Sequence, residues 1–303
     1  MTRLHAALLA ATMFMTGSAM AQTAAPFNPK AAEGAPAPRV LGNLGLASPE
    51  CIRYDAANDR YLISNLGERG TANDGFISIM TPDGRISNLK FIEGGKRGAT
   101  LIEPLGMYIL GDTLYVADST HLRKFDLNTG AARGDVLLAN AGAIRPNDLA
   151  VAPDGNVYIS DSANADASGA ILKVTSAGVA SLFTARDDSI ERANGVAVMP
   201  DGTIVHGGRG VNLVFRDTSG RILREQSLPT GQFDGIVALA DGSLLVASQL
   251  GRNVYHVPAN GQGAPKVVAS EFVVPAAIGY DTRRKRLLVP QIAMANITFV
   301  DLP

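Results

Sequence analysis

Residues 145–160 read RPNDLAVAPDGNVYIS, and this stretch holds the pattern that decides the fold of the chain. A short apolar run leads to the pair Asp154-Gly155, and a second apolar run with β-branched residues follows it. Asp-Gly pairs supply the positive φ angles that a two-residue hairpin turn needs. The stretch therefore predicts two antiparallel strands joined by a tight turn.

The same unit recurs along the chain, and each copy begins with four residues that we call its opening. The openings are Pro49-Glu-Cys-Ile52, Pro104-Leu-Gly-Met107, Pro146-Asn-Asp-Leu149, Ala193-Asn-Gly-Val196, Phe233-Asp-Gly-Ile236 and Pro275-Ala-Ala-Ile278. Their spacing of roughly 40 to 55 residues is that of four-stranded propeller blades. The sequence therefore predicts an all-β fold, a six-bladed β-propeller. A sandwich with Greek-key links would not repeat one opening at a near-constant period.

The two ends of the propeller are expected to meet in its last blade. After the sixth opening, the chain up to Pro303 has room for only three strands, and the segment 39–44 can supply the fourth, outer strand. Closing the ring in this way removes the exposed edges of an open sheet. We expect the propeller to span residues 39–303.

The residues before the propeller have a different character. Residues 1–21 combine a basic start, an apolar run and the small-residue pattern Ala19-Met20-Ala21, which is typical of a secretory signal peptide cleaved after Ala21. Residues 22–38 are rich in alanine and proline and predict a flexible lead-in. We therefore expect a secreted or periplasmic protein with no membrane span once the signal is removed.

Composition excludes some classes of partner and bond. A net charge of −1 argues against nucleic acid, which binds concentrated basic surfaces. The single cysteine, Cys51, excludes an intramolecular disulfide, and we expect it to be a buried apolar residue. Apolar residues make up 46% of the chain, enough for a core without cross-links.

The second residue of each opening, here called the ring residue, is the first candidate for function. The first strand of each propeller blade lines the central channel, so these residues become neighbours in space. They are, in blade order, Glu50, Leu105, Asn147, Asn194, Asp234 and Ala276. Four carry side-chain oxygens and none is basic. Ca²⁺ takes carboxylate and amide oxygens, so Glu50, Asn147, Asn194 and Asp234 predict one bound divalent cation, Ca²⁺ first, with other divalent cations possible.

An alternative reading treats these four as ordinary turn residues, because Asn and Asp favour such positions. Against it, two carboxylates that converge without a cation would repel each other and would be costly to bury. Zinc is not expected, since the four histidines are scattered and Cys51 should alternate away from the channel.

The openings and turns together resemble the senescence-marker-protein/gluconolactonase family of six-bladed propellers, with paraoxonase-like lactonases as cousins. The resemblance is carried by Ser48-Pro-Glu50 and by residues 145–155, 193–202 and 233–247. It implies that Glu50, Asn147, Asn194 and Asp234 are metal ligands and that Asp234 is also the general base. The implied activity is hydrolysis of a small-molecule lactone or related ester.

Two departures from the family pattern keep a second function open. Leu105 stands where paraoxonase-like enzymes carry a catalytic histidine, and the sixth opening offers only Ala276 and Ala277. The alternative is a non-catalytic periplasmic propeller with a structural cation, which binds a small ligand or a protein partner.

Other polar residues are further candidates for parts of the site. The polar ends of the second strands either orient the metal ligands or bond nearby backbone, and the latter is favoured: Asn65, Asp118, Asp161, Ser248 and Gln291. Asp148 is a candidate for a further ligand or base, although its side chain is expected to alternate away from the channel. His121 and His206 are expected to be structural, and Arg209 is a candidate contact for an anionic substrate.

Overall fold

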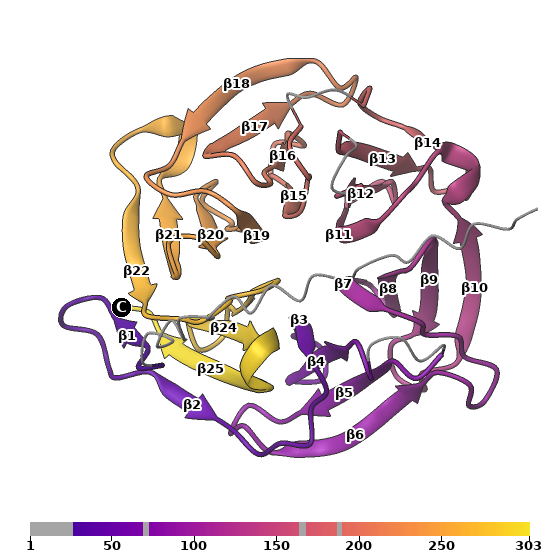
Figure 1. Cartoon of the computed structure of the whole chain (residues 1–303), viewed down its shortest axis with the longest axis horizontal. Helices are drawn as coiled ribbons and strands as arrows, with labels where there is room; N and C mark the ends of the chain where they lie inside the picture. The colour runs from indigo at the N-terminus through magenta and orange to yellow at the C-terminus, as the bar shows by residue number, and fades with distance from the viewer. Residues whose placement is uncertain (1–26, 69–72, 164–167, 187–189) are drawn as a thin grey trace, which may run out of the picture.

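The computed structural model describes residues 27–68, 73–163, 168–186 and 190–303. In this part of the chain the structure consists of β-strands with three short 3-10 helices. Six sheets follow one another around a central axis in the order of the chain, as Figure 1 shows. The predicted six-bladed β-propeller is confirmed.

The first strand of each blade lies nearest the axis. The strands of blades one to three are β3 (Pro49–Asp55), β4 (Arg60–Asn65), β5 (Phe76–Met80), β6 (Ile86–Glu93), β7 (Pro104–Leu110), β8 (Thr113–Asp118), β9 (His121–Asp126), β10 (Ala132–Leu137), β11 (Pro146–Val151), β12 (Val157–Asp161), β13 (Ala170–Val174) and β14 (Ala180–Leu182).

Blades four to six complete the ring. Their strands are β15 (Val196–Val198), β16 (Ile204–His206), β17 (Asn212–Arg216), β18 (Ile222–Ser227), β19 (Phe233–Ala238), β20 (Leu244–Ser248), β21 (Asn253–Val257), β22 (Lys266–Ser270), β1 (Lys30–Ala31), β23 (Gly279–Asp281), β24 (Arg286–Gln291), β25 (Asn296–Asp301) and β2 (Arg39–Leu41). The 3-10 helices are Ala139–Ala141, Ala259–Gly261 and Ile292–Met294.

Hydrogen bonds join the last blade to the first. Strand β2 pairs antiparallel with β25 as the outer strand of the sixth sheet. Nearer the axis, the amide of Ala277 donates to the carbonyl oxygen of Glu50 at 2.9 Å, and the amide of Ile52 donates back to Ala277 at 3.2 Å. Cys51, next to this seam, is fully buried, as expected.

Part of the predicted lead-in, residues 22–38, pairs with the propeller. Lys30 and Ala31 form β1, which adds a fifth strand to the fifth sheet by pairing with β22. Ala31 packs against the apolar cluster that blade five shares with blade six, and the amide of Ala32 donates to Val268 at 3.0 Å. This pairing satisfies backbone groups at the edge of β22.

The predicted signal peptide, residues 1–21, lies outside the described residues, so export stays a prediction. Across the ranges given above, the structure contains no helix long and apolar enough to cross a membrane.

An irregularity recurs in the first strands and decides where the ring residues point. The register between first and second strand shifts directly after the first residue of β3, β7, β11 and β19. A β-bulge of this kind sets two residues against one and re-aims their side chains. In blade four the strand starts later, at Val196, so Asn194 lies just before it.

Glycine after the ring residue lets neighbouring blades approach each other closely. A Cβ on Gly195 would lie 1.9 Å from the carbonyl oxygen of Asp234, and one on Gly235 would lie 2.3 Å from the amide nitrogen of Ile278. Only glycine fits at such distances. These contacts bring the inner ends of blades four, five and six together around the channel.

Candidate metal centre and active site

Four predicted ligands meet at one end of the channel. Glu50, Asn147, Asn194 and Asp234 all line a single cavity of about 250 Å³. Leu105, from blade two, lines it as well, whereas Ala276 is fully buried and is not part of its wall. The repeat therefore builds a mouth lined by four oxygen ligands and one apolar ring residue, Leu105, which lies between Glu50 and Asn147 in blade order.

Strained backbone leads into three of the ring residues. A residue with positive φ stands two positions before the ring residue in blades one, four and five: Ser48 (53°), Arg192 (46°) and Gln232 (57°). Residues other than glycine adopt this conformation at a cost of about 1 to 2 kcal/mol. Such strain concentrates where function requires a particular geometry.

The asparagine in blade three has a defined orientation. The Ser162 hydroxyl donates to the carbonyl oxygen of Ala193 at 2.7 Å, so its oxygen is free to accept from Asn147 Nδ2 at 3.0 Å. The amide nitrogen of Asn147 is thereby used, and its carbonyl oxygen is left without a donor. Asp234 is held in a similar way, because Gln249 Nε2 donates to its Oδ2 at 2.5 Å.

Each ring ligand keeps one buried oxygen with no hydrogen-bond partner. The four atoms are Glu50 Oε2, Asn147 Oδ1, Asn194 Oδ1 and Asp234 Oδ1. Buried polar atoms are nearly always hydrogen-bonded, so four unpartnered oxygens around one cavity are available to accept hydrogen bonds or to bind a cation. Two carboxylates and two amide oxygens form a donor set suited to a hard cation such as Ca²⁺.

The pKa values of the two ring carboxylates show that both groups are costly to ionise without a nearby positive charge. Burial raises the pKa of Asp234 to about 8, and the Asp148 carboxylate adds to that increase. Burial also raises the pKa of Glu50 well above its usual range, with further contributions from Asp234 and Asp148. A divalent cation would favour the ionised form of both groups.

No three His, Cys, Asp or Glu side chains gather as a metal site anywhere in the described part of the chain. The ring contains two such residues, and its other two ligands are asparagines. A site of this composition offers the charge of two carboxylates and the neutral oxygens of two amides.

Asp148 corrects one of the sequence-based expectations. Its side chain does not alternate away from the channel: it is fully buried, and its Oδ1 accepts from Arg53 Nη2 at 3.1 Å. The bulge at the start of β11 breaks the alternation, so Asn147 and Asp148 both face inward. The neighbouring blade makes room with Gly106, whose added Cβ would lie 2.4 Å from Asp148 Oδ1.

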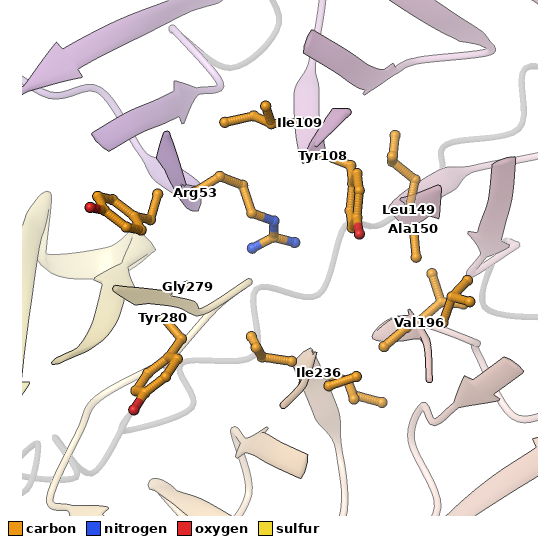
Figure 2. A pocket seen from close by; sticks show the side chains of 14 residues that line it. Arg53, Tyr108, Ile109, Leu149, Ala150, Val196, Ile236, Gly279 and Tyr280 are labelled. Atoms are coloured by element: carbon orange, nitrogen blue, oxygen red, sulfur yellow. The ribbon is translucent and has the colours of Figure 1, made fainter. Parts of the chain in front are cut away.

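Arg53 is one residue of the channel that sequence reasoning missed. Besides Asp148, its guanidinium donates to the carbonyl oxygens of Met107 and Ile278, both at 2.6 Å. Figure 2 shows its side chain reaching into a second cavity of about 240 Å³, between Tyr108 and Tyr280. Arg53 therefore ties blades one, two, three and six together across the axis.

The polar ends of the second strands bond nearby backbone, as the sequence favoured. Asp118 Oδ1 accepts from the amides of Ile102 and Glu103, each at 2.7 Å, just before the second opening. Asn65, Asp161, Ser248 and Gln291 bond backbone groups just before the openings of their own blades. These side chains hold the loops from which the ring residues emerge.

Neither candidate histidine lines the cavity of the ring. His121 is half-buried at the start of β9 and contacts Thr120 Oγ1 at 3.4 Å. His206 is buried in blade four, and its Nε2 accepts from Arg216 Nε at 2.9 Å. Arg209, by contrast, does line the cavity of the ring.

The buried imidazole predicts an effect of pH on stability. Burial and then Arg216 lower the pKa of His206 from 6.5 to about 3. Between these values the unfolded chain binds a proton that the folded chain does not, so stability falls as the pH is lowered from about 6.5 to about 3. In urea unfolding, His206→Gln should flatten this decline by up to about 1.4 kcal/mol per pH unit. Identical pH profiles in the two proteins would contradict this assignment.

Solved structures share this architecture. A gluconolactonase from Xanthomonas campestris has a TM-score of 0.64 at 20% identity, over 93% of this chain and 99% of that chain. A virginiamycin B lyase from Staphylococcus aureus has a TM-score of 0.62 at 16% identity, over 88% of this chain and 99% of that chain. At these identities the likeness shows the fold alone.

Sequence comparisons show to which family the chain belongs. Among curated proteins no sequence matches the chain significantly. The family described as the SMP-30/gluconolactonase/LRE-like region matches residues 76–277, more than half of the chain. The matched region contains Asn147, Asn194 and Asp234, whereas Glu50 precedes it. This chain belongs to the SMP-30/gluconolactonase/LRE-like family.

Proposed function

We propose that this propeller hydrolyses lactones or related carboxylic esters with a divalent cation, which we assign as Ca²⁺, held by Glu50, Asn147, Asn194 and Asp234. The observation that carries the proposal is the set of four buried, unpartnered oxygens around one cavity. The match to the SMP-30/gluconolactonase/LRE-like family supports lactone chemistry in particular.

The cation and the residues of the cavity would have separate roles in such a reaction. A bound cation would polarise the carbonyl group of the lactone and offset the negative charge that develops on its oxygen. The Asp234 carboxylate takes a proton from the attacking water and returns it to the alkoxide oxygen that leaves, so the product is a hydroxy acid. Gln249 holds Asp234 Oδ2 and thereby orients the base.

The apolar ring residue Leu105 favours a second candidate function. Leu105 lines the cavity at the position where a histidine would have offered another proton-transfer group. Asp234 is then the single candidate base. In this second function the cation stabilises the fold and takes no part in a reaction. The protein would then be a non-catalytic propeller that binds a small ligand or a protein partner at this face.

A lactone panel assayed with calcium and with chelator separates the two functions. We expect aliphatic or aromatic lactones to be hydrolysed with calcium present, and the rate to fall at least about 100-fold after chelation, because the carbonyl loses its polarising charge. Restoring calcium should restore the rate. Calcium binding without hydrolysis of any lactone would favour the non-catalytic function, and hydrolysis unaffected by chelator would exclude the metal-dependent one.

A further inference from the structure

The cavity of the ring has a basic wall that metal binding does not explain. Three arginines line it together with the four ligands: Arg145, Arg192 and Arg209. Arg145 and Arg192 hold equivalent places in blades three and four, two positions before the ring residue, and Arg209 follows β16 of blade four. The repeat therefore directs two guanidinium groups to the same side of the mouth, and a loop adds a third.

These guanidinium groups lack the acidic partners that other arginines have. Arg53, Arg60, Arg123 and Arg284 each form an ion pair. For the three arginines of the mouth, no ion pair occurs with any of the residues that the structure describes. Arg145 and Arg209 are exposed and Arg192 is half-buried, so their charged ends remain accessible to a ligand.

Once a cation is bound, the carboxylates of the ring no longer offset the positive charges of the three arginines. Two positive charges on the ion offset the carboxylates of Glu50 and Asp234, and Arg53 offsets Asp148. The three arginines then leave a net positive field at the mouth, which raises the local concentration of anions. This step rests on the function proposed above.

The cavity is also lined by apolar side chains from other blades. Leu66 follows β4 of blade one, Leu105 lies in β7 of blade two, and Ile292 follows β24 of blade six, and all three line the cavity. A molecule held in this cavity would meet guanidinium groups from blades three and four and aliphatic side chains from blades one, two and six. Arginine binds carboxylate and phosphate groups through paired hydrogen bonds.

We infer that the substrate is an anionic lactone or ester, with an acidic group held by Arg145, Arg192 and Arg209 and an apolar part against Leu66, Leu105 and Ile292. The acidic group selects the substrate, and the ring carries out the reaction. A neutral lactone of the same shape forfeits the arginine contacts.

Binding of two five-membered lactams that resist hydrolysis tests this inference without depending on turnover. One carries a carboxylate and the other a carboxamide at the same ring carbon, and both are titrated calorimetrically into the calcium-loaded protein. We expect the carboxylate to bind at least about 10-fold more tightly, and raised salt to weaken that preference. The triple variant Arg145→Gln/Arg192→Gln/Arg209→Gln should bind the two lactams equally.

Controls separate charge recognition from folding. Arg85→Gln removes an arginine that is 86% exposed and paired with Asp83, and it should keep the wild-type preference. If the triple variant unfolds, the double variant Arg145→Gln/Arg209→Gln leaves the strained position 192 untouched and should lose most of the preference.

The outcomes distinguish this inference from the proposed function. Three results would overturn the inference of an anionic substrate. They are equal affinity of the wild-type protein for the two lactams, no binding of either lactam, and a preference that survives both variants. A preference for the carboxylate that depends on the arginines, combined with no hydrolysis of any lactone, would keep the anion site and overturn the hydrolase.

Discussion

Asp234→Asn is expected to lower kcat/KM for lactone hydrolysis by at least about 10³-fold, because it removes both the proposed base and one of two ligand charges. The loss should persist at saturating calcium, since asparagine cannot accept the proton of the attacking water. Steady-state kinetics with a lactone substrate over a calcium series measure both effects.

Asn194→Ala is the matched control for this variant. It removes a neutral oxygen ligand that water can replace, so high calcium should recover part of its activity. Asp234→Asn protein that regains wild-type turnover at high calcium would contradict the role of Asp234 as base and leave it a metal ligand only.

Arg53→Met is expected to destabilise the fold by about 3 to 5 kcal/mol, because it leaves a buried carboxylate without its countercharge. Asp148 is fully buried and pairs with Arg53 at 3.1 Å. The carbonyl oxygens of Met107 and Ile278 lose a donor in the same step. Urea unfolding of the calcium-loaded protein measures the change.

The double variant Arg53→Met/Asp148→Asn distinguishes lost charge compensation from lost packing. It removes the uncompensated carboxylate, so it should recover at least half of the stability lost in Arg53→Met. A single variant within about 1 kcal/mol of wild type would show that the channel tolerates the unpaired carboxylate, through water or a change of protonation.

Most of the architecture could be predicted from the sequence because propeller blades repeat. The Asp-Gly turns and the six openings are local signals, and equivalent positions of a repeat meet in space without any knowledge of the contacts between blades. Glu50, Asn147, Asn194 and Asp234 are therefore predicted to meet, and the structure places all four around one cavity.

The parts that sequence reasoning missed depend on contacts that break the regular pattern. Alternation along β11 would have turned Asp148 outward, but the bulge directs it into the channel. Arg53 belongs to no repeated motif, and its contacts join blades that lie far apart in the sequence. The strand at Lys30 and Ala31 has no apolar alternation long enough to detect, and it forms because the edge of β22 is there to pair with.

A calcium titration followed by thermal melting and calorimetry tests the shared cation site most directly. We expect one bound calcium per chain and, in large excess of calcium over its Kd, a stabilisation of roughly 3 to 4 kcal/mol through mass action. Glu50→Gln should weaken binding sharply because it removes one of the two ligand charges, whereas Asn147→Ala should weaken it less. A wild-type melting temperature that is indifferent to calcium and to chelator, with no heat of binding, would contradict the shared site.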